Sequence, residues 1–377
     1  DFLGLSNLTV IDKAVKIIAK KGLSEGLIDI DKLSLDDPKV FKLLQKCDTT
    51  GVFQLESDGM RGYLKKLKPD SFEDIVAMLA LYRPGPLDAG MVDDYIQVKH
   101  GAKVRYPHEM LEEILKPTNG VFLYQEQVMK SAQVMAGYSL GGADILRRAM
   151  GKKKVEEMAQ QREVFVKGAA EKNIEEIKAN EIFDLIDKFS GYGFNKSHSV
   201  AYAYISYQTA WLKSHFPAPF MAAVLSGGMD DTDRVAFTVG ESKKNGVIVM
   251  VPNINQSEYE FSITDNKTII YGLGAIKGVG EALVKEIVLE RKKNGSYSDI
   301  FDLCFRIEKK YLNRRAIEAL IYSGAFDLFA IKRATLIATY PRAVRQAEQR
   351  QSDLSRGQNS LFSEVDSHTE YEKNYIK

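Results

Sequence analysis

The stretch GGADILRRAMGKKK, residues 141–154, carries residue types that could hold a polyphosphate. A glycine pair opens a predicted helix, and helix starts favour anions because backbone N–H groups point outwards there. Guanidinium groups match phosphate oxygens in pairs, and lysines add point charge. The alternative is a solvated helix face, which is the commoner explanation for an isolated basic run. Within the eight residues that end this stretch, none is acidic and five are basic: Arg147, Arg148, Lys152, Lys153 and Lys154.

The stretch LGAIKGVGEALVKEI, residues 273–287, has the pattern of a helix-hairpin-helix. In this pattern the turn Gly278-Val279-Gly280, preceded by Lys277, presents backbone N–H groups just before a helix. Such groups hold a phosphate of duplex DNA without reading bases. The alternative is a plain helix-turn-helix packing unit without a ligand. A second, degenerate hairpin is predicted at 312–326, where Ser323-Gly324 takes the turn position.

The C-terminal part turns polar from Gln349, which predicts a flexible linker. It contains one apolar pair in the pentapeptide Gln358-Asn359-Ser360-Leu361-Phe362. Since an isolated Leu-Phe pair has no core to join there, Leu361 and Phe362 form a candidate ligand for a partner's groove. Alternatively, the pair folds back onto its own domain.

A histidine at 198, in the string Lys196-Ser197-His198, follows a glycine break and precedes an aromatic helix. Taken alone, His198 is more often a capping or packing residue than a functional one. The other histidines and the two cysteines show no metal-ligand spacing, and Cys47 has no nearby base; Cys47 and Cys304 are expected to be buried thiols. A metallohydrolase or thiol enzyme is therefore poorly supported.

Composition limits the classes of partner. Hydrophobic residues make up 45% and charged residues 27% of the 377 residues, which is ordinary for a soluble globular protein. A formal net charge of +1 excludes a uniformly basic coat, so nucleic-acid binding must come from local patches. No apolar run approaches a membrane span, and a reducing, cytoplasmic location is expected. The start at Asp1, directly in a structured-looking segment, suggests a piece of a larger protein.

Hydrophobic spacing predicts mostly helices, which must position these groups. Pro84-Gly85-Pro86 is expected to form a rigid turn that stops the preceding helix. The period changes towards two between 247 and 273, which predicts a strand and then a hairpin around Thr264-Asp265-Asn266. Ser197 or Ser199 is the expected cap of the aromatic helix. Helices are predicted at 10–22, 31–47, 72–81, 110–115 and 120–136, as a pair within 155–189, and from 275 to about 346.

Several long strings together resemble the fingers region of the bacterial DNA polymerase III alpha subunits, the C-family replicative polymerases. The resemblance continues through the hairpin pattern, NRRAIEALIYSGAFD at 313–327 and the pentapeptide, and it covers nearly the whole chain. The strings in the fingers region are GVFQLES at 51–57, LYRPGP at 81–86, LRRAMGKKK at 146–154 and GFNKSHSVAY at 193–202.

The resemblance implies roles that spacing alone does not give. Asp1, in DFLGL, matches the third of three palm aspartates that bind two catalytic metal ions, Mg²⁺ in the intact enzyme; the other two are not in this sequence, so the chain alone is expected to be inactive. His198 matches a position that excludes the ribose 2′-hydroxyl. The basic residues of 146–154, with Lys196, match groups that meet the incoming dNTP. The pentapeptide resembles the peptide that binds the sliding clamp, the beta subunit.

The resemblance thus predicts a mostly α protein: a multi-helix fingers domain plus a small α domain with tandem helix-hairpin-helix and a short β-hairpin. Implied partners are primer-template DNA, dNTP, the sliding clamp and other replicase holoenzyme subunits, with no membrane. Two alternatives stay open: a non-catalytic DNA-binding and clamp-tethering module, and an error-prone alpha paralogue. The expected domains are a palm remnant at 1–10, fingers at 11–265, a duplex-binding domain at 266–346 and a flexible tail at 347–377.

Overall fold

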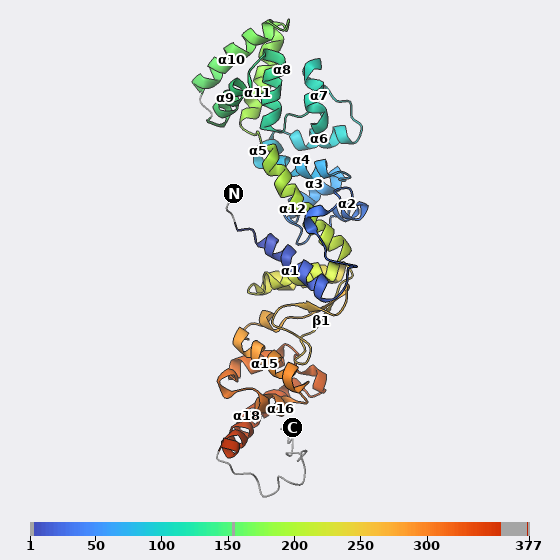
Figure 1. The fold of residues 1–377 in the computed structure, drawn as a ribbon, viewed down its shortest axis with the longest axis vertical. Helices are drawn as coiled ribbons and strands as arrows, with labels where there is room; N and C mark the ends of the chain where they lie inside the picture. Colours follow the sequence, from blue (N-terminus) through green and yellow to red (C-terminus); the bar gives the residue numbers. More distant parts are fainter. Residues whose placement is uncertain (1–3, 153–154, 356–374, 376–377) are drawn as a thin grey trace. The chain divides into compact units, whose positions relative to one another are not determined.

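The computed structural model describes residues 4–152, 155–355 and 375 (Figure 1). The chain divides into two compact units. Unit 1 combines Asp1–Asp29 with His215–Lys377, and unit 2 is Ile30–Ser214. The described part is mostly α-helical with one small sheet, so the predicted fold class is confirmed.

Unit 2 is built entirely from helices in the part that the structure describes, and it has two hydrophobic cores. One core lies between α2, α3, α4 and α12, and the other lies between α8, α9, α10 and α11. The helices are α2 (Pro38–Gln45), α3 (Asp58–Leu67), α4 (Phe72–Leu81), α5 (Pro84–Asp88), α6 (Met91–Lys99), α7 (Glu112–Leu115), α8 (Gln125–Ala136), α9 (Leu140–Lys152), α10 (Val155–Ala170), α11 (Glu176–Ser190) and α12 (Lys196–His215). Short 3-10 turns lie at Ile30–Lys32, Glu109–Leu111 and Lys116–Thr118.

The helix predicted at 120–136 and the turn predicted at residues 84–86 differ from the structure. The helix expected from 120 begins at Gln125, because Tyr124 is extended and pairs with Phe194 in an isolated bridge. The segment Pro84-Gly85-Pro86 follows the end of α4 and also begins the short helix α5. Pro84 occupies the first turn of α5, where its missing N–H costs nothing and its fixed φ suits the helix.

The cap of α12 is Asn195, whereas Ser197 or Ser199 was expected. The Asn195 side-chain oxygen accepts the backbone N–H of His198 at 2.8 Å. Ser199 is instead buried and donates its hydroxyl to the backbone oxygen of Val76 at 2.6 Å. The sequence GFNKSHS offers three candidate caps within five residues, and only the packing of α12 against α4 decides between them.

Asp74 fixes the start of α4 and pairs with a lysine from another helix. Its side chain accepts the backbone N–H of Ser71, completing a capping box, and that of Asp70. It also binds Lys99 of α6 at 2.7 Å, and only 4% of its side chain is exposed. Lys99 binds Asp70 at the same distance, but Asp70 is 69% exposed. The two carboxylates therefore offer a matched comparison.

We expect Asp74→Ala to lower the free energy of unfolding of unit 2 by about 3 kcal/mol, since it removes a helix cap and leaves the Lys99 ammonium without its buried partner. Asp70→Ala should change it by less than about 0.5 kcal/mol, because the exposed member of such a pair contributes little. Urea titration of both variants measures the difference. Equal losses would show that burial of Asp74 is not what stabilises this junction.

Unit 1 begins with α1 (Ser6–Lys20), which packs on α13 (Pro217–Ser226); α14 (Thr232–Lys244) follows. The sheet contains β1 (Ile248–Met250), β2 (Ser262–Ile263) and β3 (Thr268–Ile270) in the order β1-β3-β2. β2 and β3 form the predicted antiparallel hairpin, and β1 pairs parallel to β3. Residue 265, the expected domain boundary, lies in the hairpin turn of this unit.

The rest of unit 1 is helical around a third hydrophobic core. It contains α15 (Glu281–Asn294), α16 (Ile300–Arg306), α17 (Arg314–Tyr322) and α18 (Arg333–Ser355), with 3-10 turns at Leu273–Ala275, Lys309–Tyr311 and Asp327–Phe329. The first helix of the hairpin predicted at 273–287 is thus a single 3-10 turn. α18 runs nine residues past the predicted end at 346, because Gln, Arg, Ala and Glu there are good helix formers. The functional domain division remains a prediction.

Candidate functional site

Arg147 and Arg148 share one carboxylate on α9. Arg147 binds Asp144 through its Nε at 2.9 Å and through a terminal nitrogen at 2.8 Å. Arg148 binds the other oxygen of Asp144 through its Nε at 2.8 Å. The hydrogen bond from Arg147, together with the charges of both arginines, lowers the pKa of Asp144. The guanidiniums therefore point to one place on an exposed surface, with 37% and 66% of their side chains exposed.

The start of α9 contributes less to this cluster than the sequence suggested. The hydroxyl of Ser139 accepts the backbone N–H of Gly142 at 3.1 Å, so one of the free amides is already satisfied. At 1.5 Å per residue, Arg147 lies about 10 Å along the axis from Leu140. Anion binding at Arg147 and Arg148 would thus depend on the guanidiniums, not on the helix start. Sequence reasoning missed Asp144, although its i, i+3 and i, i+4 spacing to the arginines was a readable signal.

Several predicted site residues cannot be placed. Asp1, the proposed metal ligand, lies outside the described residues, and so do Lys153, Lys154 and the pentapeptide Gln358-Asn359-Ser360-Leu361-Phe362. Lys152 ends α9, and only its backbone is described. These roles therefore stay predictions.

His198 lies in the first turn of α12 within a row of rings. Its ring centroid is 5.6 Å from that of Phe194 and 4.2 Å from that of Tyr202. Tyr202 in turn lies 5.3 Å from Phe53. Three motif strings distant in sequence thus meet here, since the Arg83 guanidinium lies over the Phe194 ring at 4.4 Å.

Tyr192, which lies just before Phe194 in the chain, contacts two residues of the LYRPGP string. Arg83 donates to the backbone oxygen of Tyr192 at 2.7 Å. The Tyr192 ring lies so close to Gly85 that a Cβ there would approach it to 2.3 Å. Any larger residue at 85 would therefore have to displace the ring. Glycine at this position is explained by packing.

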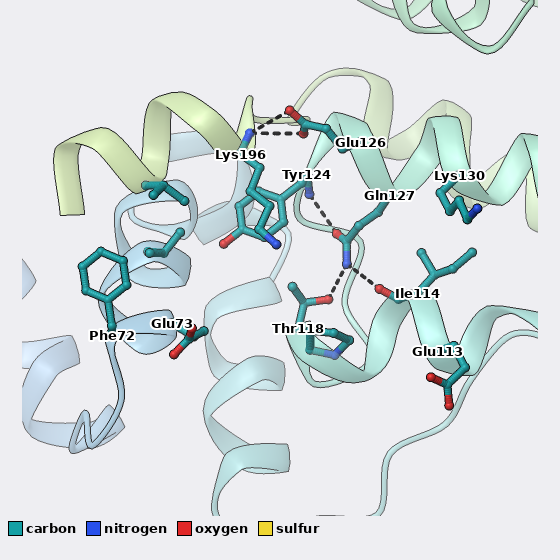
Figure 2. Close-up of a pocket in the computed structure, with 13 residues that line it drawn as sticks. Phe72, Glu73, Glu113, Ile114, Thr118, Tyr124, Glu126, Gln127, Lys130 and Lys196 are labelled. Atoms are coloured by element: carbon teal, nitrogen blue, oxygen red, sulfur yellow. Dashed lines mark hydrogen bonds between the residues drawn. The ribbon is translucent and has the colours of Figure 1, made fainter. Parts of the chain in front are cut away.

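α8 connects the α9 cluster to the start of α12. It packs on α9, and its Glu126 carboxylate accepts the backbone N–H of Lys196 at 3.1 Å and the side-chain amide of Asn195 at 3.0 Å. The Lys196 ammonium lies 5.5 Å from the centroid of the Tyr124 ring. Figure 2 shows Glu126, Lys196 and Tyr124 among the residues that line a cavity of about 560 Å³. Lys196 and His198 therefore share one helix turn, and Glu126 fixes its backbone.

Hydrogen bonds of one buried side chain connect several residues that line this cavity. Buried Gln127 accepts the backbone N–H groups of Leu123 and Tyr124, and it donates to Thr118 and to the backbone oxygen of Ile114. Burial raises the pKa of Tyr124, so its phenol stays neutral at ordinary pH. These contacts of Gln127 (Figure 2) hold the segment before α8, which is extended at Tyr124 and pairs there with Phe194.

The hairpin turn in unit 1 presents backbone donors. Gly278 has φ +94°, a left-handed conformation that favours glycine. The N–H of Val279 is used by the backbone oxygen of Ile276, and its side chain is buried. Among the described residues no partner accepts the N–H groups of Gly278 and Gly280, and no side chain caps α15. Gly278 and Gly280 are therefore the donors of this turn, while Val279 anchors it.

Two exposed cations flank this turn. Lys277 precedes it, and the Arg315 Nε from the start of α17 lies 3.4 Å from the position a Cβ would take on Gly278. Sequence reasoning missed Arg315 because 37 residues separate it from Gly278. The turn, Lys277 and Arg315 together form a compact cationic surface of the kind that a phosphate backbone contacts.

The second hairpin is different. At its turn Gly324 has φ +89°, but the ion pair between Arg333 and Asp327 covers it. The backbone N–H of Gly324 bonds to Ile321 and that of Ala325 to Leu320. The donors of this turn are thus satisfied internally, which favours a structural role for the degenerate hairpin.

No group of three or more His, Cys, Asp or Glu side chains suited to a metal ion occurs in the described part of the chain. Cys304 is buried, which raises its pKa to about 12, whereas Cys47 is only half-buried; the expectation that both are buried is right for Cys304 alone. No described helix is long and apolar enough to cross a bilayer.

Comparison with known proteins identifies two matching family models and a set of similar proteins. Residues 7–173 match the model of the bacterial DNA polymerase III alpha subunit finger domain, and residues 246–336 match a helix-hairpin-helix motif. The whole chain is 50% identical to the DNA polymerase III subunit alpha of Pasteurella multocida and 51% identical to that of Haemophilus influenzae, and it covers 33% of each. The Escherichia coli K12 protein of the same name is 51% identical over 96% of the chain and 32% of its own length. The chain thus spans about a third of these relatives.

Proposed function

Because this chain belongs to the family of bacterial DNA polymerase III alpha subunits, we propose that it is the part of a replicative DNA-directed DNA polymerase that positions the incoming dNTP, grips the primer-template duplex and attaches to the sliding clamp. In the intact enzyme the reaction is template-directed nucleotidyl transfer in DNA replication. The observation that carries this proposal is the pair of guanidiniums, Arg147 and Arg148, converging on the one partly exposed carboxylate of Asp144.

We propose that unit 2 binds the triphosphate of the nucleotide with basic side chains and selects its sugar by steric exclusion. Arg147 and Arg148 exchange the Asp144 carboxylate for triphosphate oxygens, because the triphosphate carries more negative charge than a single carboxylate. Lys152, Lys153 and Lys154 add charge behind them, and Lys196 adds one on α12. His198 is proposed as the wall that excludes a ribose 2′-hydroxyl.

The duplex is proposed to meet unit 1 at the first hairpin. The N–H groups of Gly278 and Gly280 bind one phosphate, Val279 holds the turn in place, and Lys277 and Arg315 neutralise adjacent phosphates. Such contacts position a duplex without reading its sequence. This suits a replicative enzyme, which must hold any sequence equally well.

The metal belongs to the proposal for the full-length protein. Mg²⁺ would activate the primer 3′-hydroxyl and stabilise the leaving pyrophosphate when bound by Asp1 and the two aspartates that the resemblance implies. The described residues contain no group of three or more His, Cys, Asp or Glu side chains suited to a metal ion, and Asp1 lies outside them.

The tail is proposed to bind the sliding clamp through Gln358, Ser360, Leu361 and Phe362. Replacing Leu361 and Phe362 with alanine in a full-length alpha subunit should abolish clamp binding, because burying these two side chains contributes roughly 3–6 kcal/mol before entropy costs. Distributive synthesis without the clamp should be spared. Titration of the clamp against both proteins measures this, and retained affinity would contradict the assignment. We also propose that the full-length protein binds other holoenzyme subunits and is located in the cytoplasm.

The second candidate, a non-catalytic DNA-binding module, is favoured by the unsatisfied amides of the first hairpin. A primer-extension assay separates the two. We expect synthesis from a full-length alpha subunit that contains this sequence and duplex binding without synthesis from the chain alone. A full-length subunit that binds duplex but never extends a primer would support the module instead.

A further inference from the structure

The rings around His198 form a row of two residues of α12, His198 and Tyr202, and two residues outside it, Phe194 and Phe53. His198 and Tyr202 are four residues apart in α12, which places them on the same side of the helix, whereas Phe194 precedes the helix in the extended bridge with Tyr124. The His198 and Tyr202 rings are tilted by only 33°, with their centroids 4.2 Å apart, so they stack. Phe194 instead meets His198 edge-on at 72°. His198 therefore has an aromatic contact on both sides.

Both ends of this row are anchored by hydrogen bonds. At one end Phe53 is buried, its N–H donates to Thr209 at 3.1 Å, and its carbonyl accepts from Ser206 at 2.9 Å. At the other end Arg83 lies over Phe194 while donating to the carbonyl of Ala80 at 2.8 Å. The row is thus held by neighbours that do not depend on a ligand.

Tyr202 is the link between the buried end and His198. Its ring lies 5.3 Å from Phe53 and stacks on the histidine. Its hydroxyl makes no hydrogen bond within the described part of the chain, so the ring and not the phenol group accounts for its contacts. Removing the ring would leave space into which the His198 imidazole could turn.

We propose that Tyr202 is a positioning residue for sugar discrimination, which acts by keeping His198 from rotating away from an incoming nucleotide. This rests on the proposed role of His198. The His198 side chain can exclude one additional hydroxyl only if the imidazole keeps its position, since displacements of about 1 Å at a reacting site change rates by large factors. Stacking on Tyr202, backed by Phe53, supplies that resistance.

The test is single-nucleotide incorporation by a full-length alpha subunit that contains this sequence. The measured quantity is the ratio of kcat/KM for a ribonucleotide to that for the matching deoxynucleotide. Tyr202→Leu should raise this ratio roughly 3- to 10-fold, the range expected for the loss of one aromatic pair. Most of the change should appear in the ribonucleotide KM or kcat. Tyr202→Phe, which keeps the ring, should keep the wild-type ratio.

Two further variants separate the possible failures. His198→Ala tests the proposed function: an unchanged ratio there would remove the role of His198 itself. If His198→Ala raises the ratio and Tyr202→Leu does not, the inference on Tyr202 is overturned. A proportional loss with both nucleotides in Tyr202→Leu also overturns it, because that result indicates general damage. Should Tyr202→Leu not fold, Phe53→Leu loosens the same ring from behind and should raise the ratio in the same direction.

Discussion

Replacing both Arg147 and Arg148 with alanine should lower the kcat/KM for dNTP incorporation by a full-length alpha subunit at least about 100-fold. Each charge-assisted hydrogen bond to a phosphate contributes about 1.5–3 kcal/mol, so each single substitution should cost about tenfold or more. The loss should appear in the nucleotide KM if the contact is equal in ground and transition states, and in kcat if it strengthens during transfer.

A control arginine distinguishes a specific contact from loss of surface charge. Arg105 is exposed in the same unit, and no described carboxylate pairs with it. Arg105→Ala should leave kcat/KM within about twofold, the scale of an ordinary surface substitution. Unchanged kinetics for both single variants of Arg147 and Arg148 would remove the triphosphate assignment.

The second large effect is expected at the first hairpin. Gly278→Val should weaken duplex binding about tenfold or more, because a β-branched residue is strained at φ +94° and turns the donor N–H groups away from their phosphate. The affinity should fall for all duplex sequences alike, since the contact is to the backbone. Fluorescence anisotropy with duplexes of different sequence measures both features.

Gly295 is a matched control for this substitution. It follows the other end of α15, has φ +83°, and a Cβ there would meet no atom within 4 Å. Gly295→Val therefore also places a β-branched residue at a positive φ, without touching the proposed phosphate donors. Equal losses of duplex affinity in both variants would mean that backbone strain at the ends of α15 weakens DNA binding, and that the hairpin turn does not contact the duplex.

Local signals in the sequence were sufficient for most of the fold. The helical spacing of apolar residues predicted α4 to the residue, and the switch to alternation predicted the β2–β3 hairpin. The order of motif strings predicted the family. Each of these features is determined by residues within one helix turn or one strand pair, so it can be predicted from the local sequence.

The missing parts are those that depend on tertiary contacts. The choice of Asn195 as the cap follows from how α12 packs on α4, which buries Ser199. Arg315 reaches Gly278 only because α17 folds back beside the hairpin. The row from Phe53 to Phe194 joins segments some 140 residues apart. Spacing cannot reveal such neighbours, although Asp144 could have been found from helical periodicity.

Hydrogen exchange on a full-length alpha subunit, with primer-template duplex and then with the next correct dNTP, tests most directly whether the chain meets phosphate at two separate places. The account predicts that duplex alone slows exchange at the amides of 278–282, and that the dNTP then slows exchange in α9 and in the first turn of α12. Protection by the dNTP that leaves both α9 and the start of α12 unchanged, or protection by duplex that leaves the first hairpin unchanged, would contradict it.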